Sequence, residues 1–157
     1  MTGASAGIGK AFADVLAERG YGLVLTARRA DRLEAVAADL RARHGIPVAV
    51  VVADLADPAA PATLVAAIAA LGMQVDVLVN NAGYGVPGRY AATAWAQQRD
   101  FLQVLVTAVA ELTHRLLPGM IARRFGRVLN VASLAALVPA APGHTLYAAS
   151  KAFLVKF

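Results

Sequence analysis

Residues 1 to 9 read Met-Thr-Gly-Ala-Ser-Ala-Gly-Ile-Gly, and a helical pattern begins inside this stretch. Apolar residues recur at spacings of three and four, at Ile8, Phe12, Val15 and Leu16. The glycines therefore fall before and inside the first turn of a helix, where backbone N–H groups and the helix dipole favour an anion. Glycine also lets a phosphate approach the backbone closely. The stretch indicates a phosphate-binding loop or, alternatively, only a tight loop.

Short apolar segments alternate with helical patterns along the rest of the chain. We expect strands at 21–27, 47–53, 75–80 and 127–132. We expect helices at 31–44 and 59–70, and either one long helix bent near Pro118 or two joined helices at 93–123. A final helix is expected from His144 or Thr145. The helix at 31–44 has an apolar face and a glycine stop, formed by Leu33, Val36, Ala37, Leu40 and Gly45.

This alternation predicts an α/β fold, a doubly wound parallel sheet with helices on both faces, in a single partial domain over residues 1–157. In such sheets ligands bind beyond the carboxyl ends of the strands. Asp54, Asn81 and Ser133 follow three of the predicted strands. We therefore expect these side chains to lie at a ligand site.

The composition limits the classes of protein that the chain can form. It has 157 residues, of which 59% are apolar and 16% charged, which favours one folded domain over disorder. The region 48–71 is interrupted by charged residues and prolines, so we predict no membrane span. No leader pattern is visible, which favours the cytoplasm. The absence of cysteine excludes disulfides and thiolate zinc sites, and no other metal-binding cluster is visible.

The net charge of +5 raises the question of nucleic acid. The arginines are scattered in pairs, with few aromatic residues between them. This distribution is typical of a solvated surface, so we predict that nucleic acid is not a partner.

Tyr147 and Lys151 are four residues apart near the end of the chain, a spacing that places both on one face of a helix. A phenol has a pKa of about 10, and a neighbouring ammonium stabilises its anion and brings the pKa towards neutrality. Ser133 would orient a carbonyl or hydroxyl oxygen while the tyrosine exchanges a proton. The alternative is an ordinary half-buried helix face.

Five motifs occur along the chain in a fixed order. They are Thr2-Gly3-x-x-x-Gly7-Ile8-Gly9, Asp54-Leu55, Asn80-Asn81-Ala82-Gly83, Ser133 and Tyr147-x-x-x-Lys151. Their order and spacing resemble the compact branch of the short-chain dehydrogenase/reductase family, and the resemblance covers the whole chain. It implies a Rossmann-type domain that transfers a hydride between NAD(P)(H) and a small carbonyl or alcohol.

The resemblance also implies residue roles. Tyr147 would be the acid/base and would also contact the cofactor. Lys151 would bind the nicotinamide ribose and lower the tyrosine pKa, and Ser133 would orient the substrate. The cofactor phosphates would be cradled by Gly3, Ser5, Gly7, Ile8 and Gly9. Asp54 would contact the adenine, and Asn81 and Gly83 would line the cofactor site. Members of the family are often homo-oligomers, which we also expect for the full-length protein.

The predicted cofactor preference rests on the residues at the end of the strand predicted at 21–27. Enzymes that prefer NAD carry an acid about 20 residues past the glycines. Here residues 27–29 read Ala-Arg-Arg. Because arginine pairs with a 2′-phosphate and a carboxylate would repel it, we predict NADP(H), with Arg28 as the main contact and Arg29 second. The alternative is that both arginines solvate the next helix.

The sequence departs from the family pattern in the long helix and at both ends. Leu105 stands where many members carry an asparagine that is thought to hold a water behind the lysine. Met1 stands in place of a first strand, as a GTG valine codon read as a start would produce, and Phe157 falls inside the last helix. We therefore expect a fragment without its first and C-terminal strands. The alternative functions are a non-catalytic dinucleotide-binding module or an inactive fragment.

Overall fold

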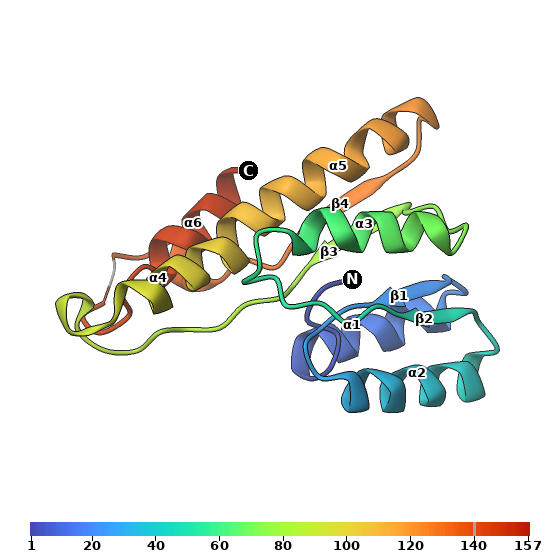
Figure 1. Cartoon of the computed structure of the whole chain (residues 1–157), viewed down its shortest axis with the longest axis horizontal. Helices are drawn as coiled ribbons and strands as arrows, with labels where there is room; N and C mark the ends of the chain where they lie inside the picture. The colour runs from blue at the N-terminus through green and yellow to red at the C-terminus, as the bar shows by residue number, and fades with distance from the viewer. Residues whose placement is uncertain (140) are drawn as a thin grey trace.

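The structure is a computed structural model that describes residues 1–139 and 141–157. Strands and helices alternate along the chain (Figure 1). The strands are β1 (Leu23–Leu25), β2 (Val48–Val50), β3 (Val77–Asn80) and β4 (Arg127–Asn130). The α-helices are α1 (Gly7–Glu18), α2 (Ala30–His44), α3 (Ala60–Ala70), α4 (Trp95–Leu102), α5 (Ala108–Ala122) and α6 (Tyr147–Lys156). Short 3₁₀ turns are η1 (Tyr90–Ala92) and η3 (Leu134–Ala136), and η2 (Gln103–Thr107) is a π-helical turn.

The strands form two parallel pairs. β1 pairs with β2 in the register Leu23↔Val48, and β3 pairs with β4 in the register Val77↔Arg127. The predicted α/β architecture is confirmed, although each strand is shorter than the apolar segment that predicted it. Among the described residues, β4 has β3 as its only strand neighbour. Val128 and Leu129 of β4 are exposed, where the sequence predicts a buried strand.

Met1 and Thr2 join the two strand pairs. The Thr26 amide donates to the Met1 carbonyl (3.0 Å), and the Thr2 amide donates to the Val79 carbonyl (3.0 Å). Thr2 and Thr26 form a parallel bridge. Behind this short link lies a cavity of about 230 Å³ whose walls include β1 and β3. Among the described residues, β1 and β3 are therefore not paired directly with each other.

The Thr2 side chain holds the link in place. It is almost fully buried, and its Oγ1 accepts hydrogen bonds from the amides of Asn81 and Ala82, both at 3.0 Å. In addition, the Asn81 side chain donates from Nδ2 to the carbonyls of Thr2 (3.1 Å) and Gly3 (3.2 Å). The segment after β3 is thus fixed to the start of the chain.

We expect Thr2→Val to lower the free energy of unfolding by about 2–4 kcal/mol, because the isosteric side chain leaves two backbone amides without an acceptor. Thermal unfolding followed by circular dichroism measures the change. Thr63→Val is the matched control, since Thr63 is exposed on α3 and its hydroxyl donates to the Ala59 carbonyl. A Thr2→Val protein as stable as the wild type would contradict this account of the link.

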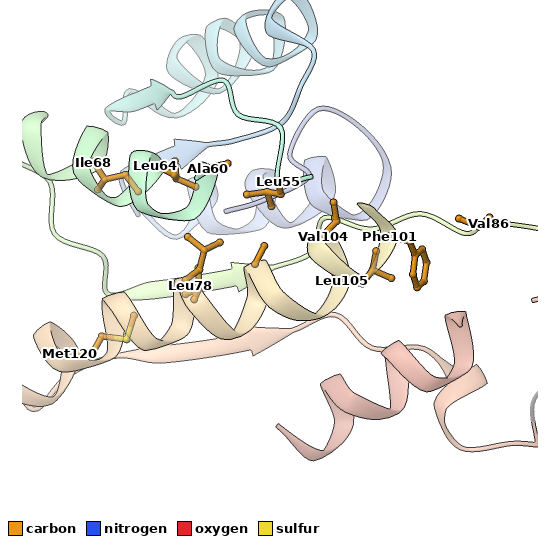
Figure 2. Packing of buried hydrophobic residues seen from close by; sticks show 12 residues of the cluster. Leu55, Ala60, Leu64, Ile68, Leu78, Val86, Phe101, Val104, Leu105 and Met120 are labelled. Carbon is orange, nitrogen blue, oxygen red and sulfur yellow. The ribbon is translucent and has the colours of Figure 1, made fainter. Parts of the chain in front are cut away.

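Two hydrophobic clusters lie on the two sides of the strands. α1 and α2 pack with β1 and β2 on one side, and α3 and α5 pack with β3 on the other (Figure 1). Figure 2 shows the second cluster, which extends from Met120 at one end to Phe101 and Val86 at the other. Helices therefore cover both sides, as the sequence predicts.

The buried face of α1 differs from the predicted one. The buried residues are Gly9, Ala13 and Ala17, whereas Ile8 is 60% exposed and Val15 is 43% exposed. Small residues face the strands here because the helix approaches the backbone of the first loop closely. In α2 the predicted apolar face is confirmed, and Gly45 ends the helix with φ 64°.

The helical run from Trp95 to Ala122 joins α4, η2 and α5 and includes Pro118. By length and composition it is apolar enough to cross a membrane, with a mean hydropathy of 1.3, and 39% of its most apolar window is buried. It lies outside the region 48–71, from which the sequence predicts no membrane span. Core helices of soluble proteins meet the same criterion, so the absence of a membrane partner stays a prediction.

Candidate active site

A cavity of about 810 Å³ lies beyond the carboxyl ends of all four strands. Segments that follow each strand line it, together with the first loop and α6. Among the lining residues are Gly3, Ser5, Ile8, Arg28, Arg29, Asp54, Asn81, Gly83, Tyr147 and Lys151. Residues from widely separated parts of the sequence thus meet at one site, at the sheet edge where ligands bind in such folds.

The first loop opens into this cavity. Gly3 and Gly7 have φ values of 68° and 54°, a left-handed conformation that glycine adopts without strain. Gly7 and Gly9 do not line the cavity. A Cβ atom on Gly9 would overlap the Gly3 carbonyl and the Asn81 side chain, so this glycine permits close packing of α1 on the loop.

Arg28 and Arg29 lie at the cavity wall after β1, and both are exposed. Arg29 Nη2 donates to Ser5 Oγ at 2.9 Å, which joins this wall to the first loop. Across the cavity, Asp54 Oδ1 accepts from the Ala56 amide at 3.0 Å and fixes the turn after β2. The cavity therefore carries two guanidinium groups beside its glycine-rich end.

Tyr147 is the first residue of α6, and Lys151 lies one turn further on. The Lys151 ammonium is 5.8 Å from the centre of the Tyr147 ring. It is buried and donates to the Val131 carbonyl at 2.7 Å. Burial lowers the pKa of Lys151 from its ordinary value. The carbonyl after β4 thus holds the lysine beside the tyrosine.

Ser133 does not line the cavity, although its neighbours Val131 and Ala132 do. Its Oγ accepts from the Ala135 amide at 3.2 Å and caps η3, which packs against α6. Within residues 1–139 and 141–157, its own O–H has no acceptor. Within these residues the hydroxyl proton is therefore not committed to a protein acceptor.

Leu105 lies in the π-helical turn η2 and is fully buried. A Cβ atom placed on Gly83 would lie 3.6 Å from Leu105 Cγ and 3.8 Å from Lys151 Nζ. Leu105 and Lys151 therefore both lie beside Gly83, and the leucine side chain cannot make a hydrogen bond there. That this position matches the family asparagine stays a prediction.

The predicted site residues do not include one wall of the cavity. Tyr84, Val86, Pro87, Gly143 and His144 also line it. These residues lie in irregular segments without a periodic pattern, so only their closeness to Asn81 and Tyr147 in the sequence signalled them. Burial, with a smaller contribution from Asp100, raises the pKa of Tyr84 from its ordinary value. In the described part of the chain, no group of three acidic or histidine side chains is placed to hold a metal ion.

The chain matches the short chain dehydrogenase family over residues 1–157 and belongs to it. It is 35% identical to a very-long-chain 3-oxoacyl-CoA reductase of Laccaria bicolor, with all of this chain and 47% of that protein aligned. It is 37% identical to a sulfoacetaldehyde reductase of Chromohalobacter salexigens, with all of this chain and 62% of that protein aligned.

Solved structures agree with this assignment. L-sorbose reductase from Gluconobacter frateurii, complexed with NADPH and L-sorbose, superposes with a TM-score of 0.92 at 35% identity, with all of this chain and 59% of that chain covered. A 7beta-hydroxysteroid dehydrogenase superposes with a TM-score of 0.93 at 30% identity, with 99% and 60% covered. The Rossmann-like fold is thus confirmed, and the chain spans about half to three fifths of the length of these relatives.

Proposed function

We propose that this chain is the cofactor-binding and catalytic part of an oxidoreductase that transfers a hydride between NADP(H) and a small carbonyl or alcohol. The observation that carries the proposal is the pairing of Tyr147 with the buried Lys151 in the cavity into which the glycine-rich loop opens. The relatives support it, because they are named as reductases and dehydrogenases.

The residues present fit a dinucleotide. Gly3, Ser5 and Ile8 would hold the phosphates, and Asp54 would contact the adenine, since each lines the cavity. A Cβ atom placed on Gly7 would have no other atom within 4 Å. We propose that Gly7 and Gly9 also belong to the loop that would hold the phosphates. Asn81 and Gly83 line the cavity between this loop and Lys151.

The preference for NADP(H) rests on the two arginines. Because Arg29 already donates to Ser5, Arg28 has more of its donors available for a 2′-phosphate. We therefore keep Arg28 as the main contact and Arg29 as the second. Solved relatives with 34% and 35% identity are described in complex with NADPH, which supports this choice.

When bound, the nicotinamide would supply or accept the hydride. In the reduction of a carbonyl, Tyr147 would give its phenolic proton to the substrate oxygen as the carbon–oxygen double bond becomes a single bond. We keep Ser133, which follows the cavity-lining residues Val131 and Ala132, as the residue that would orient that oxygen. Lys151, held by the Val131 carbonyl, would place a positive charge beside the phenolate that remains. In oxidation each proton moves the other way.

Further parts of the proposal concern the whole protein. We propose a cytoplasmic enzyme that is a homo-oligomer and that binds neither nucleic acid nor membrane. A non-catalytic dinucleotide-binding module is less well supported, because Ser133, Tyr147 and Lys151 are all present and two of them share the cavity.

The proposal is tested with the protein expressed from its full reading frame. NADPH consumption is followed by absorbance with a panel of aldehydes, ketones and 3-oxoacyl thioesters. We expect at least one carbonyl to be reduced with NADPH, and more slowly with NADH. A folded protein that binds NADPH but reduces no member of the panel would favour the non-catalytic module.

A further inference from the structure

Two segments far apart in the sequence are joined at the wall of the cavity that the predicted site residues do not include. The Gly88 amide donates to the Gly143 carbonyl at 2.9 Å, and Gly88 forms a parallel bridge with His144. Thr145 Oγ1 donates to the Val86 carbonyl at 2.9 Å. We call this junction, formed by Val86, Gly88, Gly143, His144 and Thr145, the strap.

One side of the strap is anchored in the core. Val86 is only 8% exposed and lies with Phe101 at the end of the hydrophobic cluster (Figure 2). The Tyr84 ring meets the Phe101 ring edge-on, with 5.7 Å between their centres. The segment that carries Tyr84 and Val86 continues directly from Asn81 and Gly83, which line the cofactor part of the cavity.

The other side of the strap leads to the catalytic tyrosine. The Tyr147 amide donates to the His144 carbonyl at 3.0 Å, so the strap residue His144 fixes the backbone at the start of α6. The strap therefore connects the segment after β3 with the residue proposed to exchange the proton.

Thr145 has an unfavourable backbone conformation. Its φ is 47°, in the left-handed region that a β-branched residue rarely adopts. Glycine would adopt this conformation without strain, as Gly143 does with φ 85°. The side chain present here compensates through its hydroxyl, which makes the bond to Val86. Strained residues of this kind cluster at functional sites.

We propose that Thr145 is a positioning residue, whose hydroxyl holds Tyr147 in place relative to the cofactor segment that follows β3. The inference rests on the proposed function, because it assigns Thr145 a role in the same reaction. Thr145 acts through the strap and not on the substrate, and the loss of its hydroxyl lets the start of α6 shift. A displacement of about 1 Å can lower a rate by about a hundredfold.

The test compares Thr145→Val, which keeps the shape and loses the hydroxyl, with Thr145→Ser, which keeps the hydroxyl. In the protein from the full reading frame, we expect Thr145→Val to lower kcat by about 10- to 100-fold while the Kd for NADPH is unchanged. Thr145→Ser restores most of the kcat. Equal loss in both variants, or a wild-type kcat in Thr145→Val, would overturn the proposal.

Hydrogen exchange of the cofactor-free protein gives a readout that needs no turnover. We expect the Gly88 and Tyr147 amides to exchange faster in Thr145→Val than in the wild type, and Thr145→Ser to exchange like the wild type. Unchanged exchange in Thr145→Val would show that the hydroxyl does not hold the strap. If the wild type reduces no carbonyl, the proposed function fails, while this exchange measurement decides the strap separately.

Discussion

Tyr147→Phe is expected to lower kcat for carbonyl reduction by about 10²- to 10⁴-fold, the usual contribution of a general acid. The phenyl ring keeps the packing of Tyr147 against the core cluster, so the fold and the Kd for NADPH stay close to those of the wild type. Steady-state kinetics and a cofactor titration measured on the same preparation give both quantities.

Tyr84→Phe is the matched control for this prediction. Tyr84 is a second phenol on the wall of the same cavity, but it is not part of the Tyr147–Lys151 pair. We expect Tyr84→Phe to retain most of the wild-type kcat. Full activity of Tyr147→Phe, or an equally large loss in both variants, would refute the assignment of Tyr147.

Arg28→Ala is expected to weaken NADPH binding by about 10- to 100-fold, since a hydrogen bond to a charged group contributes about 1.5–3 kcal/mol. The affinity for NADH should change little, because NADH has no 2′-phosphate. Arg29→Ala should have the smaller effect, because Arg29 also bonds Ser5. Fluorescence titration of both cofactors against each variant measures the ratio of the two affinities.

Arg32→Ala controls for the loss of one positive charge. Arg32 is exposed on α2 and does not line the cavity. We expect the Arg32→Ala variant to bind NADPH with the same affinity as the wild type at the same ionic strength. If the Arg28→Ala and Arg32→Ala variants have the same affinities for NADPH and for NADH, then Arg28 and Arg29 only solvate the helix that follows them.

The sequence predicts the elements well where periodicity and a stop signal coincide. In α2 the spacing of Leu33, Val36, Ala37 and Leu40 and the glycine at position 45 predict both the buried face and the end. In α1 the same reasoning selects Ile8 and Val15, which are exposed. Periodicity identifies the large apolar residues of a helix. The buried face of α1 instead carries small residues such as Gly9 and Ala13, because this face packs closely against a backbone, and a hydrophobic pattern does not reveal such packing.

The sequence predicts the parts of the site that lie in motifs, but it does not predict the contact between two loops. Arg28, Asp54, Tyr147 and Lys151 lie in one cavity because they follow strand ends or share a helix face, and both relations can be read from the sequence. The strap joins Val86 to Thr145, which are 59 residues apart, through a side chain and backbone bonds. No spacing rule encodes such a contact, so only the folded structure shows it.

The most direct test of the central claim is thermal unfolding of the 157-residue chain with NADPH, with NADH and without cofactor. A ligand that binds only the folded state adds about 2.7 kcal/mol at one hundred times its Kd. For a chain of this size that corresponds to a rise in Tm of roughly 5–10 °C. We predict a cooperative transition that NADPH raises more than NADH does at equal concentration. A cooperative transition that neither cofactor shifts would contradict the account.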